Sequence, residues 1–229
     1  MKADRDFVVF NGDTTNDMME EGKIARYYMG TASRTFATER PVYVLRGNHE
    51  FRGRDATAWP RHFSTETGHP YTAFRYGPFF FIGLDSGEDK PDSDIEYHGL
   101  YYTGPYLQEE ARWLREVVAS PAFRESRVRI VFSHIPPESD GWQGNRNVNE
   151  WFVPILNEGG IDLMISGHTH DHRFDAAGSG LSDAQFPVWV NAAVERLDVT
   201  VDASGRLSLR AFRPDGTETH TLEIPPSQR

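Results

Sequence analysis

The chain contains no cysteine, which excludes both disulfide bonds and thiolate metal sites, so the redox state of its compartment cannot be inferred. It also lacks any apolar run of about 18 residues, the length that a helix needs to cross a bilayer. Acidic side chains outnumber basic ones, with 34 Asp and Glu against 24 Lys and Arg. The formal net charge of -10 disfavours unaided binding to nucleic acid or anionic membranes. These absences predict a soluble protein with no membrane span and no nucleic-acid partner, and leave its oligomeric state open.

Four short segments share one pattern, in which an apolar run leads into a tight turn and then into a side chain that can bind a metal. The carboxyl ends of neighbouring strands meet at one edge of an α/β sheet, so we expect these side chains to converge. They offer a carboxylate, an amide oxygen and imidazoles, which suit divalent Mn, Zn, Fe, Co or Ni. The segments are Gly12-Asp13, Gly47-Asn48-His49-Glu50, Ser133-His134 and Gly167-His168-Thr169-His170.

Apolar runs and turn signals predict an α/β fold, and 229 residues favour one domain over two. If the backbone at the last ligand loop is extended, His168 and His170 point to one face. The segment from 88 to 106 is either a substrate lid or a plain solvated loop. Strands are predicted at 7–10, 42–45, 71–76, 79–84, 128–132 and 161–165, helices at 17–28, 106–118 and 149–156, and an antiparallel β tail at 188–190, 197–201 and 207–212.

On these motifs the chain resembles the calcineurin-like metallophosphoesterase superfamily, which includes purple acid phosphatases and Ser/Thr phosphoprotein phosphatases. The amino-acid sequence at 6–13, 46–53 and 84–92 is similar to that of a bacterial subgroup whose members are often exported. The resemblance implies an αββα sandwich of two mixed sheets flanked by helices, with the antiparallel β part at its C-terminal end. It also implies one catalytic domain over 1–229 and a centre with two metal ions.

Carried over to this chain, the resemblance implies that Asp13 bridges the two metals. It implies that Asn48, His134 and His168 complete one metal shell, while His170 binds the other metal.

The chain departs from the family pattern at the first motif, an Asp-x-His at the end of an opening strand. No Asp-x-His occurs in the 229 residues, and only 11 residues precede Gly12. We therefore expect that Met1 is not the natural start, that the domain is truncated at its N-terminus, and that any export signal lies upstream. If the chain is instead complete, we expect one complete metal site and half of a second, held by Asp13 and His170.

The resulting prediction is a hydrolase of phosphoric mono- or diesters that acts on a small phosphorylated substrate with a metal-bound hydroxide as nucleophile. The resemblance implies that His49 donates a proton or a hydrogen bond to the leaving oxygen. Arg46 or Arg52 could bind a phosphate oxygen of the substrate, although a structural role in salt bridges is an equal alternative for both. The second hypothesis, prompted by the missing Asp-x-His, is a non-catalytic metal-binding or interaction module. The intact Asn48-His49 pair speaks against it.

Overall fold

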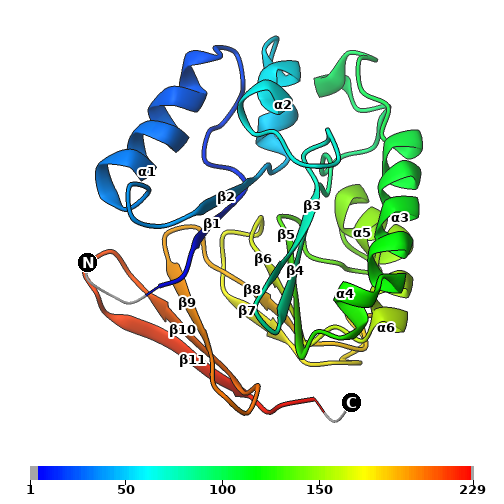
Figure 1. Ribbon diagram of the computed structural model, residues 1–229. Helices are drawn as coiled ribbons and strands as arrows, with labels where there is room; N and C mark the ends of the chain where they lie inside the picture. Colours follow the sequence, from blue (N-terminus) through cyan, green and yellow to red (C-terminus); the bar gives the residue numbers. More distant parts are fainter. Residues whose placement is uncertain (1–4, 228–229) are drawn as a thin grey trace.

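A six-stranded mixed sheet lies at the centre of the structure, a computed structural model that describes residues 5–227 (Figure 1). Its strand order is β3-β4-β5-β6-β8-β7. The four inner strands run parallel to one another, and each edge strand is antiparallel to its neighbour. The bounds are β3 Thr72–Tyr76, β4 Phe79–Leu84, β5 Val128–Ser133, β6 Leu163–Ser166, β7 Arg173–Asp175 and β8 Val188–Val190.

Four helices cover one face of this sheet: α3 (Gly104–Ala119), α4 (Pro121–Arg124), α5 (Gln143–Trp151) and α6 (Val153–Gly159) (Figure 1). Leu107, Ala111 and Leu114 recur at helical spacing along α3 and are fully buried. They join one hydrophobic cluster with Val131 and Met164 of the sheet. Burial of this apolar face holds the helical layer in place.

The opposite face is covered by a second β layer made of two separately hydrogen-bonded sheets. In the antiparallel sheet, alternate residues Leu207, Leu209 and Ala211 of β10 are buried in a cluster with Ile130 and Trp189. The strands are β1 (Val8–Asn11) and β2 (Val42–Leu45), which pair in parallel, and β9 (Arg196–Val201), β10 (Leu207–Phe212) and β11 (Glu218–Ile224).

An outer helical layer packs on β1 and β2. Its core contains Tyr28 and Trp59, together with Phe10 from β1 and Val44 from β2. None of the helices within residues 5–227 combines the length and the apolar character needed to cross a bilayer. The elements are the π-helix η1 (Ile24–Met29), α1 (Gly30–Thr35) and α2 (Trp59–His62), with 3-10 turns η2 (His49–Phe51), η3 (Ala56–Ala58) and, elsewhere, η4 (Ile95–Tyr97).

The expected αββα sandwich with an antiparallel C-terminal part is confirmed, but three local predictions are wrong. The strand at 188–190, expected in the antiparallel tail, belongs to the central sheet and runs parallel to β6. It is buried on both faces, so its sequence lacks the alternation that would have indicated its place. The helix expected at 17–28 is helical only in its later part, because the Asp17 side chain accepts a hydrogen bond from the backbone of Met19 and forms a turn. The helix expected at 149–156 is two helices, α5 and α6, and Pro154 lies in the first turn of the second, where a proline is tolerated.

Candidate metal centre

The four ligand loops meet although they come from two different β layers. Two follow β1 and β2 of the second layer, and two follow β5 and β6 of the central sheet. The Asn11 amide, at the end of β1, donates to the carbonyl oxygens of Ser133 (3.4 Å) and Ile165 (3.1 Å). These hydrogen bonds tie the end of β1 to the ends of β5 and β6, so the loops that follow lie together.

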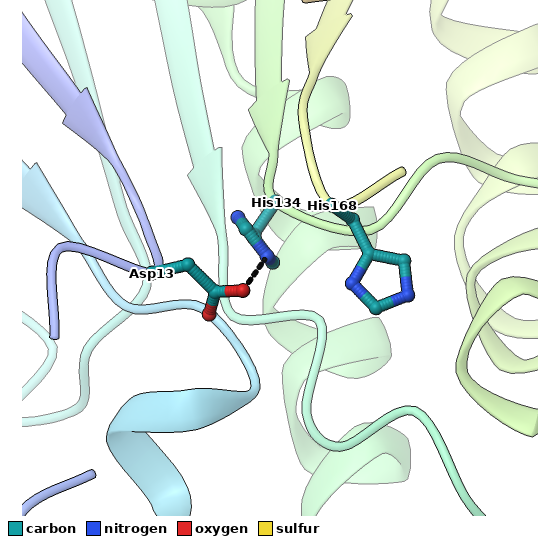
Figure 2. A group of neighbouring side chains, drawn as sticks. All are labelled: Asp13, His134 and His168. Carbon is teal, nitrogen blue, oxygen red and sulfur yellow. Dashed lines mark ion pairs between the residues drawn. The ribbon is translucent and has the colours of Figure 1, made fainter. Parts of the chain in front are cut away.

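Asp13, His134 and His168 place their ligand atoms within 4.8 Å of one another (Figure 2). Oδ2 of Asp13 lies 3.0 Å from Nε2 of His134. Oδ1 of Asn48 accepts a hydrogen bond of 3.1 Å from Nδ1 of His168, so the amide faces the same space. The structure therefore brings together four of the five side chains predicted as metal ligands.

The imidazole of His134 tests whether this group fits a metal ion. Its Nδ1 lies 2.7 Å from the carbonyl oxygen of Asn11, which can only accept, so Nδ1 carries a hydrogen. In the neutral ring, Nε2 is then a bare lone pair. This atom is buried, and Oδ2 of Asp13 lies 3.0 Å from it, so the two form an ion pair when the ring is protonated. A buried ring nitrogen that is oriented by a backbone carbonyl and faces a carboxylate is typical of a metal ligand, so the residues fit a divalent cation.

The surroundings of Asp13 and His168 favour an ionised carboxylate and a neutral imidazole, the forms of these groups that bind a metal. Burial raises the pKa of Asp13, but the neighbouring His134 and the backbone N–H of His49 outweigh it and hold the pKa below 3.8. Burial, helped by the charge of His134, lowers the pKa of His168 to about 4. Burial also lowers the pKa of His134, yet Asp13 prevails and raises it above 6.5, so a proton and a cation compete for that pair.

Backbone strain concentrates at the same loops. Among the described residues, four that are not glycine have a positive φ, and three of them are predicted ligands: Asp13 (51°), His168 (70°) and His170 (67°), the fourth being His98. Such conformations cost energy and often mark functional sites. The expectation of extended backbone at His168 and His170 is therefore wrong. The exposed His170 lies outside the group of three, although its charge contributes to the lowered pKa of His168.

Glu50 clamps the first two ligand loops together, a role that the sequence did not reveal. Its carboxylate is fully buried and accepts hydrogen bonds from the backbone N–H groups of Asp13 (2.9 Å), Thr15 (3.2 Å) and Gly47 (2.7 Å). It also accepts from the hydroxyl of Tyr28. The only signal in the sequence was its place directly after Asn48-His49, since a glutamate is normally expected at the surface.

The loops also approach each other too closely for side chains at two glycines. A Cβ on Gly47 would lie 2.2 Å from Oδ1 of Asp13, and one on Gly12 would lie 2.6 Å from Nδ1 of His134. Gly12 has a φ of 84°, which favours glycine in any case. The tight turns noted in the sequence are therefore required by contact between the loops.

His49 is held beside the group with one ring nitrogen committed. Its Nδ1 donates to the carbonyl oxygen of Asn16 (2.8 Å), and its backbone N–H donates to Oδ1 of Asp13 (3.1 Å). Its Nε2 lies 3.9 Å from Oδ2 of Asp13 and is the ring nitrogen not held by the Asn16 carbonyl. This geometry is suitable for a proton donor at the edge of the metal group.

Arg46 and Arg52, predicted to bind substrate, both form ion pairs with carboxylates of the protein. Arg46 binds Asp85 through Nε (3.0 Å) and a terminal nitrogen (2.6 Å). Arg52 binds Glu88 (2.9 and 3.0 Å) and Asp89 (3.0 Å). These contacts match the alternative of a salt-bridged structural role, and a contact with phosphate stays a prediction.

The segment from 88 to 106 is anchored at its base to the second ligand loop. Glu88, Asp89 and Tyr97 are buried, and the Tyr97 hydroxyl donates to Glu88 (3.0 Å) beside the Arg52 ion pairs. Ile95 and Leu100 are exposed. The description of a plain solvated loop therefore does not hold for its base.

The sequence of this chain shows which family it belongs to. A family model described as calcineurin-like phosphoesterase matches residues 2–172, and the chain belongs to that family. Purple acid phosphatase 17 of Arabidopsis thaliana is 27% identical over 187 residues, which covers 74% of this chain. The chain spans 54% of the length of that relative.

Solved structures show the same fold at low sequence identity. Purple acid phosphatase PPD1 from yellow lupin seeds matches with a TM-score of 0.67 at 13% identity, covering 97% of this chain and 47% of that one. GAP50, described as the anchor in the inner membrane complex of Plasmodium, matches with a TM-score of 0.66 at 14% identity, covering 97% of this chain and 79% of that one. At these identities the likeness concerns the fold alone.

Proposed function

We propose that this chain hydrolyses phosphoric esters with the help of a divalent cation held by Asp13, Asn48, His134 and His168. The observation that supports this most is the buried Nε2 of His134, which faces Oδ2 of Asp13 at 3.0 Å while the Asn11 carbonyl holds the other ring nitrogen. When bound, a divalent cation in such a site supplies positive charge for phosphoryl oxygens and lowers the pKa of a water molecule. His170 and Asp13 would hold a second cation.

The chain's own residues orient the substrate and move the proton. His49 protonates the leaving oxygen through Nε2, since its Nδ1 is fixed by the Asn16 carbonyl. Glu50 keeps the backbone of both ligand loops in register, so that Asp13 and His49 stay at their present separation. Ion pairs of Arg46 and Arg52 hold the neighbouring loops in place around this group.

The test is hydrolysis of p-nitrophenyl phosphate and its bis-ester by the protein loaded in turn with Mn, Zn, Fe, Co and Ni. We expect turnover of at least one ester, and a loss of roughly 10²- to 10⁴-fold in kcat for His49→Ala with metal content unchanged. His62→Ala is the matched control, because His62 pairs with Glu21 outside the metal group. Metal-loaded protein that cleaves neither ester would contradict the proposal and favour a non-catalytic module.

A further inference from the structure

An open cavity of about 280 Å³ is lined by Trp142, whose ring contacts His168 of the metal group. It lies between the loop that follows β4 and the beginning of α5, is open to solvent, and is lined by Asp89, Lys90, Pro91, Gly141, Trp142, Gln143 and Arg146. The backbone N–H of Gly144 donates to the carbonyl oxygen of Asp89 (3.0 Å), which joins the two walls. The volume is close to the lower end of ordinary small-molecule sites, about 300 Å³.

Trp142 connects this cavity to the metal group. Its ring lies edge-on to the imidazole of His168, with 6.0 Å between centroids and an interplanar angle of 82°. A phosphoryl group held at His168 would therefore have its organic substituent within reach of the indole. Trp142 is 61% exposed, an unusual amount for so large an apolar side chain next to a polar site. Covering it with a ring would gain apolar burial.

Two cationic side chains of the cavity can donate to hydrogen-bond acceptors, while the carboxylate of Asp89 in its lining is paired with Arg52 (3.0 Å). Arg146 donates to the carbonyl oxygen of Gly141 (2.7 Å) and to Oε1 of Gln143 (3.0 Å), which fixes its guanidinium while its exposed position lets it donate further. The ammonium of Lys90 lies at the same cavity and pairs with Glu96 (2.7 Å). An apolar ring face beside cationic donors suits a heterocycle better than a hydrocarbon chain.

We infer that this cavity is a specificity subsite in which a planar, acceptor-bearing ring such as a nucleobase stacks on Trp142 with its edge toward Arg146. The inference rests on the proposed function and narrows its substrates to nucleoside phosphates. The excess negative charge of the chain disfavours long nucleic acids as the source of that ring.

Binding of adenosine tests the subsite without any hydrolysis. In calorimetric titrations of the metal-loaded protein, adenosine binds saturably and ribose does not. Trp142→Ala weakens adenosine binding about ten-fold or more, while Trp142→Phe retains most of it. Arg146→Gln weakens it as well. Tyr27→Ala is the matched control, since Tyr27 is an exposed aromatic residue of η1 and its loss leaves binding unchanged.

Kinetics separate this inference from the proposed function. For adenosine 5′-monophosphate, Trp142→Ala raises KM about ten-fold, whereas KM for ribose 5-phosphate stays the same. Adenosine that fails to bind, or that binds Trp142→Ala and Arg146→Gln as tightly as the original protein, overturns the subsite. Protein that cleaves no phosphoric ester overturns the proposed function, and the adenosine titration then still decides the subsite.

Discussion

Replacing Glu50 by glutamine tests whether this buried carboxylate positions the metal ligands. One of its oxygens accepts from Thr15 and Tyr28, the other from Asp13 and Gly47. A glutamine would direct its NH₂ group toward the Tyr28 hydroxyl, which can turn to accept. The buried N–H of Thr15 would then have no acceptor, and the remaining bonds would lose the assistance of charge.

One unsatisfied buried donor costs about 1 to 3 kcal/mol, and charged acceptors form the stronger hydrogen bonds, so we expect Glu50→Gln to lose about 2 to 4 kcal/mol in the free energy of unfolding. Urea titration with linear extrapolation measures this loss. Metal affinity should fall roughly 10- to 100-fold, as for other residues that orient ligands. The exposed Glu150, changed to Gln, is the control. A loss below about 1 kcal/mol with unchanged metal affinity would refute the reasoning.

Two further predictions concern a close contact and a buried acid. Gly47→Ala places a methyl group 2.2 Å from Asp13, so metal affinity measured by titration should fall at least about 10-fold, whereas Gly22→Ala, which meets nothing within 4 Å, should not change it. Burial, followed by the charge of Asp85, raises the pKa of Glu110 well above 4.5 in the folded protein. The free energy of unfolding of the wild type should therefore fall as the pH rises from 4.5 to the folded-state pKa, because the folded protein binds a proton that the unfolded chain releases. Glu110→Gln removes this dependence, so its free energy of unfolding relative to the wild type should rise by up to about 1.4 kcal/mol per pH unit in that range, and a difference that does not change with pH would contradict the raised pKa.

Much of the candidate site could be predicted because its signals are local. A strand, a glycine and a ligand occupy consecutive positions, as in Phe10 to Asp13 or Leu45 to Asn48, and the physical requirement for a tight turn before a metal ligand is met within a few residues. The helical spacing of α3 is equally local. Buried strands such as Val188–Val190 lack alternation, so their partners could not be predicted from the sequence.

By itself, the sequence indicated the family and four side chains that lie together in the structure, Asp13, Asn48, His134 and His168, since these depend on residue type and short spacing. Only the tertiary structure decided what surrounds them. Arg46 meets Asp85 across 39 positions, and Trp142 reaches His168 from a different loop. Glu50 became a clamp because two strands of the second layer bring backbone donors around it. Contacts between distant segments arise from packing, and packing is a property of the whole fold.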